Sequence, residues 1–235
     1  MTEPATLEFL PDAGIEAQQL FILLHGVGGT PKYMEPLAKA LRQVFPAAAI
    51  LVPPGFDPHD GGTEGRQWFS VRDIDEDNRP ERVAQAMPRL LAYVQEAQAR
   101  FGLSPSSTAL AGFSQGAIMS LEAVQANENL AGRVLAFSGR YAQLPKAPPP
   151  STTIHLLLGE DDNVINVSHA QTAQAWMGGL QGDCTTDVAS KVGHELHPAL
   201  VQCAIERLKT YIPLRSWEAA LRMMDQEAPQ DSTLH

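Results

Sequence analysis

The segment 108–119 places a serine between two glycines, in the order Gly112-Phe-Ser114-Gln-Gly116. A short apolar run enters this pattern, and an apolar, helix-forming run leaves it. A serine on so sharp a strand-to-helix turn has a strained backbone and tolerates little bulk two residues away, which favours glycine at both positions. The turn lifts the hydroxyl above the sheet, next to the first N–H groups of the helix. Ser114 is therefore the candidate nucleophile.

A serine hydroxyl is a weak nucleophile at neutral pH and needs an imidazole that takes its proton. The chain has seven histidines, so position along the chain must decide among them. Only His194 follows both an expected strand and a glycine, and it is the candidate base. The competing histidines have other expected places: mid-strand (His155), within a helix (His169), in an irregular loop (His59) and at the start of a helix, where a capping role suffices (His197).

The imidazole in turn needs a buried carboxylate that fixes its tautomer and stabilises its charged form. Asp161 and Asp162 lie together after an apolar run and are the main candidates, with Glu160 and Asp183 as more remote ones. Neighbouring side chains point in different directions, so only one of the two aspartates can reach the imidazole. The chain order serine, acid, histidine is the order found in α/β-hydrolases.

Buried strands and amphipathic helices alternate along the chain, and they must position these residues. Apolar runs predict strands at 19–24, 47–52, 133–137, 153–158 and 184–189, besides the run before Ser114. Helical spacing predicts helices at 34–45, 79–100, 115–126, 166–177 and 198–211. This alternation predicts one α/β domain over residues 1–235, a mostly parallel sheet with helices on both faces. Loops that leave the carboxyl ends of such strands form the site, and they bring Ser114, the acid and His194 to one edge.

Composition excludes several classes of function. A net charge of −10 without a cluster of Lys or Arg argues against nucleic acid as a partner. No apolar run reaches bilayer length and no signal peptide is evident, so we expect no stable membrane insertion and a cytoplasmic protein. Cys184 and Cys203 are expected to be buried free thiols. His194 and His197 lack the spacing of a metal-binding helix, and no metal is expected.

Five motifs together resemble the carboxylesterase/acyl-protein thioesterase family of α/β-hydrolases, from about residue 20 to residue 220. They are Leu-Leu-His25-Gly-Val-Gly, Gly65-Arg-Gln-Trp68-Phe69, Gly112-Phe-Ser-Gln-Gly116, Gly159-x-x-Asp162-x-Val164 and Gly193-His194. The resemblance implies an α/β-hydrolase fold with little or no lid and cofactor-free hydrolysis of carboxylic esters and thioesters. The chain departs from the family at the acid, with Asp162-Asn-Val-Ile-Asn where the family usually has Asp-Pro-Val-Val-Pro, and with Leu158-Gly159 where the family has His-Gly.

The resemblance also implies roles for particular residues. The family's Gly-x-x-Asp spacing selects Asp162 rather than Asp161. The backbone N–H of Gln115, directly after the nucleophile, is one expected donor to a developing oxyanion, and the resemblance places the second at Val27. The resemblance assigns Trp68 and Phe69 to the wall of the acyl pocket, although composition alone does not distinguish them from core residues.

The predicted function is that of a serine esterase that cleaves a small carboxylic ester through an acyl-enzyme on Ser114, with His194 as general base. Thioesters are a second candidate class of substrate. Two alternatives stay open: a catalytically inactive binding module on a hydrolase scaffold, or a lysophospholipase or peptidase of the same fold. A dienelactone hydrolase is disfavoured because its nucleophile is a cysteine.

Residues 213–235 are expected to form a C-terminal amphipathic helix and tail. Trp217, Ala220, Leu221 and Met224 form an apolar stripe at helical spacing. Packing of this stripe against its own domain is the favoured interpretation, and homodimerisation is the alternative. Residues 226–235 are expected to fray.

Overall fold

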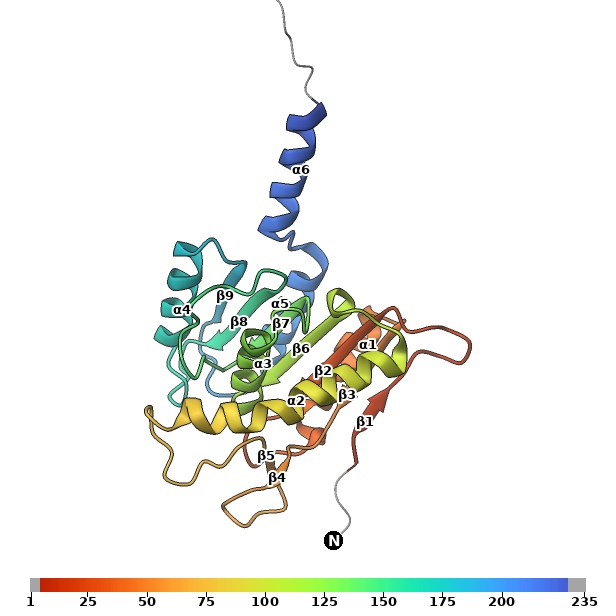
Figure 1. Cartoon of the computed structure of the whole chain (residues 1–235). Helices are drawn as coiled ribbons and strands as arrows, with labels where there is room; N and C mark the ends of the chain where they lie inside the picture. The colour runs from red at the N-terminus through yellow and green to blue at the C-terminus, as the bar shows by residue number, and fades with distance from the viewer. Residues whose placement is uncertain (1–4, 228–235) are drawn as a thin grey trace, which may run out of the picture.

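A seven-stranded sheet forms the centre of the computed structural model, which describes residues 5–227 (Figure 1). Its strand order is β1-β3-β2-β6-β7-β8-β9, and only β1 runs antiparallel to its neighbour. The strands are β1 (Leu7–Phe9), β2 (Gln19–Leu24), β3 (Ala48–Val52), β6 (Thr108–Phe113), β7 (Arg133–Phe137), β8 (Thr153–Gly159) and β9 (Cys184–Ala189). The prediction of a mostly parallel α/β sheet is confirmed.

Helices cover both faces of the sheet (Figure 1). One face carries α2 (Arg79–Phe101), α3 (Gln115–Ala126) and α4 (Ser168–Gly179), and the other carries α1 (Glu35–Val44) and α5 (Pro198–Thr210). Short 3-10 turns, η1 (Pro31–Met34) and η2 (Pro105–Ser107), precede α1 and β6. Each central strand buries both of its faces: in β2, for example, Leu20 packs toward one core and Phe21 toward the other. This two-sided burial explains the continuous apolar runs in the sequence.

Several short elements were not predicted. Strand β1 pairs three residues with the edge of β3. Strands β4 (Asp57–Pro58) and β5 (Arg66–Gln67) form a small separate antiparallel pair. The longer predictions hold well, since β2, β9 and α3 have the predicted bounds. None of the helices between residues 5 and 227 is long and apolar enough to cross a membrane.

The C-terminal helix α6 (Leu214–Glu227) extends away from the domain (Figure 1). Trp217 and Leu221 are 54% and 59% exposed, so the prediction that the apolar stripe packs against its own domain is wrong. The local spacing that favours a helix says nothing about what covers it. Homodimerisation through this stripe stays a prediction. The side chain of Met224 and the tail at 228–235 lie outside the described residues.

Candidate active site

Ser114 lies on the turn between β6 and α3, with a backbone φ of 52° and ψ of −115°. This left-handed conformation is strained for a residue with a side chain, as the sequence predicted. A Cβ at Gly112 would collide with the carbonyl of Gly116, and a Cβ at Gly116 would collide with the carbonyl of Leu24. Both glycines are therefore required by backbone contacts, and together they allow the turn to present Ser114 at the edge of the sheet.

Ser114, His194 and Asp162 form a continuous chain of polar contacts. The Nε2 atom of His194 lies 3.0 Å from Oγ of Ser114, and its Nδ1 atom lies 2.8 Å from Oδ2 of Asp162. An ionised carboxylate only accepts hydrogen bonds, so Nδ1 carries the proton and Nε2 is free to accept one from the serine hydroxyl. The fold brings these side chains together although Ser114 and His194 are 80 residues apart.

The carboxylate of Asp162 is buried and well satisfied. Its second oxygen, Oδ1, accepts hydrogen bonds from the backbone N–H groups of Val164 and Ile165, at 2.9 and 2.8 Å. Burial by itself raises the pKa of Asp162, but the hydrogen bonds from Ile165, His194 and Val164 outweigh it and lower the pKa below its usual value. Asp162 therefore stays ionised beside the imidazole. The neighbouring Asp161 is exposed.

Aromatic rings hold the imidazole of His194 from one side. The ring of Phe113 lies 4.9 Å from the His194 ring, and the ring of Tyr33 lies 5.0 Å from Phe113, measured between centroids. The hydroxyl of Tyr33 accepts a hydrogen bond from the backbone N–H of Leu196, two residues after the histidine. The loop that carries His194 is thus fixed at its side chain and at its backbone.

The backbone N–H groups of Val27 and Gln115 are the expected oxyanion donors. Among residues 5–227, neither Val27 nor Gln115 donates its N–H to a backbone carbonyl. The glycine loop after β2 passes directly beside the serine, because a Cβ at Gly26 would lie 3.3 Å from Cβ of Ser114. The N–H of Gln115 belongs to the first residue of α3, where helical N–H groups have no partner within the helix.

The segment 65–69 ties this glycine loop to the nucleophile turn. Trp68 donates from Nε1 to the carbonyl of His25 at 2.7 Å, and Arg66 bonds both Gly28 and Gly29 through its backbone. The side chain of Gln115 accepts from the backbone N–H of Trp68 and donates to the carbonyl of Phe69, each at 2.8 Å. The segment thus connects the two expected oxyanion donors.

The structure contradicts the expected place of Trp68 in the wall of the acyl pocket, whereas that role of Phe69 stays a prediction. Trp68 is fully buried and Phe69 is 4% exposed, and both pack in the core beneath α2 and α3. A fully buried indole offers no surface to an acyl chain, so Trp68 supports the glycine loop and does not line an open pocket. Sequence reasoning missed this role, although the motif Gly65-Arg-Gln-Trp indicated that the segment mattered.

His25 is a further supporting residue. Its Nε2 accepts the backbone N–H of Gly55 at 2.8 Å, so Nδ1 carries the proton and donates to the carbonyl of Gly26 at 2.7 Å. Burial lowers the pKa of His25, against the effect of the Gly26 bond, and the charge of Arg66 lowers it further. The ring is therefore neutral and joins two loops at the site.

Replacing Trp68 with phenylalanine is expected to lower kcat for an acyl ester by about tenfold, with little change in KM, because the loop beside Ser114 loses an anchor. The free energy of unfolding is expected to fall by about 1–3 kcal/mol, since the carbonyl of His25 is left buried without its donor. Steady-state kinetics and thermal melting measure the two effects.

Trp176 offers a matched control. It lies on α4, is 47% exposed, and also donates its indole N–H to a backbone carbonyl, that of Pro145, at 2.7 Å. Replacing Trp176 with phenylalanine is expected to leave kcat unchanged. Equal losses of kcat in the two variants would mean that the Trp68 anchor has no special effect on the site.

Two other histidines make hydrogen bonds within the fold, away from Ser114. His197 accepts the backbone N–H of Ala199 at the start of α5, which confirms its predicted capping role. His155 is buried within β8, as predicted, and Nδ1 contacts Thr185 at 2.8 Å. Cys184 and Cys203 are free, as predicted, but each is only partly buried.

The mostly parallel sheet, the glycine-flanked serine turn and the loops at the carboxyl ends of the strands define an α/β-hydrolase fold. Residues 9–212 match the phospholipase/carboxylesterase family, and the chain belongs to it. The chain is 43% identical over 205 residues to Esterase YpfH of Escherichia coli K12, which covers 87% of this chain and 88% of that protein. It is therefore an enzyme, a carboxylesterase.

Solved structures agree with this fold. The crystal structure of esterase PE8 has a TM-score of 0.77 at 25% identity, over 87% of this chain and 97% of that one. A carboxylesterase from Bacillus cereus has a TM-score of 0.71 over 86% of this chain and 91% of that one; at 16% identity it supports the fold alone.

Proposed function

We propose that the chain cleaves carboxylic esters through an acyl-enzyme on Ser114. The Oγ atom of Ser114 attacks the acyl carbon while Nε2 of His194 takes the hydroxyl proton. The tetrahedral intermediate carries a negative oxygen, which the N–H groups of Val27 and Gln115 stabilise. His194 then gives its proton to the leaving alcohol oxygen, and the C–O bond breaks. Water, deprotonated by the same imidazole, attacks the acyl-enzyme and releases the acid.

The observation that carries this proposal is the contact from Ser114 through His194 to Asp162, at 3.0 and 2.8 Å. An imidazole that accepts a proton becomes cationic, and a buried ionised carboxylate beside it stabilises that cation. The lowered pKa of Asp162, set by hydrogen bonds that outweigh its burial, supports this role.

The acyl and alcohol parts of the substrate are proposed to contact exposed apolar side chains near Ser114. Val27, Tyr33 and Val164 are 38%, 41% and 62% exposed, although large apolar side chains are usually buried. Each belongs to an element at the site: the glycine loop, the aromatic stack behind His194, and the acid loop. Thioesters present the same acyl carbon, so we include them in the proposed substrate class.

A fluorophosphonate probe tests the proposal, because it reacts only with an activated serine. We expect the intact protein to gain one probe mass, with the modified peptide mapping to Ser114. Hydrolysis of acyl esters and thioesters of increasing chain length then defines the preferred substrate. Absence of labelling, together with no hydrolysis across the series, would favour the inactive binding module.

A further inference from the structure

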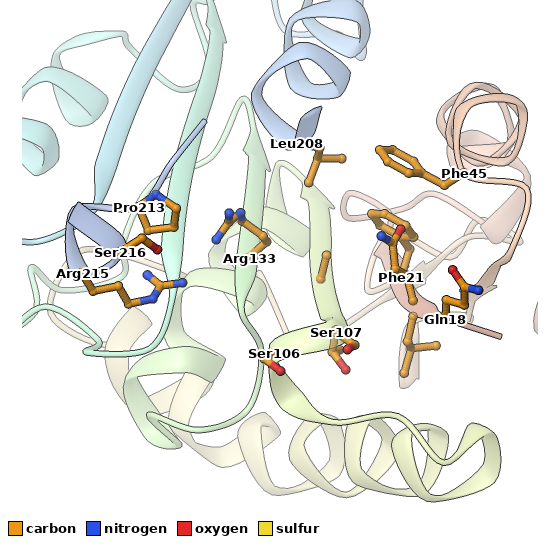
Figure 2. Close-up of a pocket in the computed structure, with 14 residues that line it drawn as sticks. Gln18, Phe21, Phe45, Ser106, Ser107, Arg133, Leu208, Pro213, Arg215 and Ser216 are labelled. Carbon is orange, nitrogen blue, oxygen red and sulfur yellow. The ribbon is translucent and has the colours of Figure 1, made fainter. Parts of the chain in front are cut away.

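A cavity of about 440 Å³ opens at the amino ends of β2, β6 and β7, next to the last turn of α5 and the start of α6 (Figure 2). Ser114 follows the carboxyl end of β6, whereas Ala109 at the other end of that strand lines the cavity. Five steps along the strand, each of about 3.3 Å, separate the two by about 17 Å. The cavity is therefore distinct from the catalytic edge, and its volume lies within the range of about 300–1,000 Å³ that is usual for small-molecule sites.

The guanidinium of Arg133 lies in this cavity (Figure 2). Its Nη1 atom donates to the carbonyl of Gly132 at 3.2 Å and to Oγ1 of Thr153 at 2.9 Å, and both acceptors are neutral. Among the side chains that the structure describes, Arg133 forms no ion pair, and its Nε and Nη2 atoms make no hydrogen bond. Half-buried charges are normally paired, and the free N–H groups of Arg133 are available to an anion that enters the cavity.

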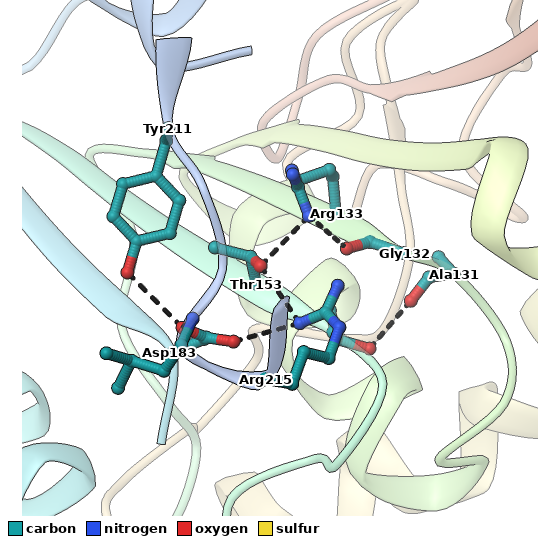
Figure 3. Close-up of polar contacts among 9 residues, drawn as sticks. Ala131, Gly132, Arg133, Thr153, Asp183, Tyr211 and Arg215 are labelled. Carbon is teal, nitrogen blue, oxygen red and sulfur yellow. Dashed lines mark hydrogen bonds and ion pairs between the residues drawn. The ribbon is translucent and has the colours of Figure 1, made fainter. Parts of the chain in front are cut away.

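A second guanidinium increases the excess of positive charge. Arg215 donates to the same Thr153 oxygen at 3.2 Å and pairs with Asp183 at 2.9 Å (Figure 3). Asp183 is further engaged by the hydroxyl of Tyr211 and the backbone N–H of Leu214. Two cations thus share one hydroxyl oxygen while a single carboxylate neutralises one of them.

The direction of the pKa shift of Arg133 agrees with this excess of positive charge. Burial and the positive charge of Arg215 lower the pKa of Arg133, although Asp183 opposes them. Burial and the positive charges of Arg133 and Arg207 lower the pKa of nearby His155 to about 4, although Asp187 opposes them. His155 is therefore neutral and does not change the charge count. One positive charge at this cavity therefore has no counter-charge in the described chain, and an anion there would be stabilised.

The shape of the cavity selects among anions. Phe21, Phe45 and Leu208 line it on the side away from Arg215 (Figure 2). A ligand whose anionic end binds Arg133 can therefore place an apolar body against these three side chains. The planar fork of a guanidinium matches a carboxylate or a phosphate in two parallel hydrogen bonds. The three apolar side chains favour an anion with an apolar chain over inorganic phosphate. We propose that this cavity binds a small carboxylate with a short apolar chain, with its head on Arg133.

Calorimetric titration of the full chain with hexanoate tests this site. We expect a dissociation constant at or below about 1 mM, and no measurable binding of the neutral hexanamide. The variant Arg133→Gln, which can still donate to Thr153, is expected to weaken hexanoate binding by at least about tenfold. Arg72→Gln is the matched control: it removes the same charge from an exposed arginine outside the cavity, and wild-type affinity is expected.

Further arms separate this site from the catalytic one. Ser114→Ala is expected to bind hexanoate as the wild type does, so the result does not depend on the proposed catalytic role. In the wild type, hexanoate is expected to slow amide hydrogen exchange at residues 106–109 and 208–216 but not at residues 112–116. This measurement uses no variant, so it tests the site even if Arg133→Gln does not fold. Unchanged binding in a folded Arg133→Gln, protection confined to 112–116, equal binding of hexanamide, or tighter binding of inorganic phosphate would each overturn the proposal.

Discussion

Replacing Ser114 with alanine is expected to lower kcat for a short acyl ester by a factor of about 10⁵–10⁶, because the nucleophile is removed and the remaining groups act only on water. The fold is expected to persist. Alanine is no larger than serine, and the glycines at 112 and 116 still leave room for the turn. Single-turnover and steady-state kinetics with a chromogenic ester measure the loss, and circular dichroism checks the fold.

Ser190 provides the matched control for this substitution. It is exposed and belongs to the same loop as His194, so Ser190→Ala makes the same chemical change near the site without removing the proposed nucleophile. We expect wild-type kcat in that variant. If Ser114→Ala retained more than about one hundredth of wild-type kcat, the acyl-enzyme on Ser114 would have to be abandoned.

The sequence predicted the fold well where both faces of a strand are buried. Strands β2 and β7 and helix α3 have the bounds that their patterns indicate. Short pairings carry too few residues for a period to show: β1 pairs three residues, and β4 and β5 pair two each. The placement of α6 was wrong for another reason. Its apolar stripe is visible in the sequence, but whether a stripe meets the domain depends on the direction in which the chain leaves Pro213.

At the site, the sequence predicted that Ser114, Asp162 and His194 lie together, but it did not predict the hydrogen bonds that hold the surrounding loops in place. Ser114 and His194 were found because strand order sends loops of a parallel sheet to one edge. The side chain of Gln115, which bonds both Trp68 and Phe69, had been considered only for its backbone N–H. A contact between residues 46 or 47 positions apart depends on loop paths that local patterns do not encode. The same limit explains why a buried Trp68 was expected in a pocket wall.

Asp162→Asn is expected to lower kcat by about 10⁴ while leaving KM and the fold nearly unchanged. The reason lies in the two backbone N–H groups of Val164 and Ile165, which both donate to Oδ1. In the asparagine variant, the amide oxygen must stay at these donors, so the amide NH₂ turns toward Nδ1 of His194. Nδ1 then has to accept, the proton moves to Nε2, and the imidazole can no longer take the proton of Ser114.

Asp161→Asn is the control, because it makes the same change one residue earlier on an exposed side chain. Its kcat is expected to stay within about twofold of wild type, since exposed substitutions away from a site have small effects. A large loss in Asp161→Asn with an active Asp162→Asn would reassign the acid. If neither variant lost activity, the tautomer of His194 would be set by something other than the carboxylate that contacts it. The pair therefore tests the orienting role of Asp162 separately from the nucleophile.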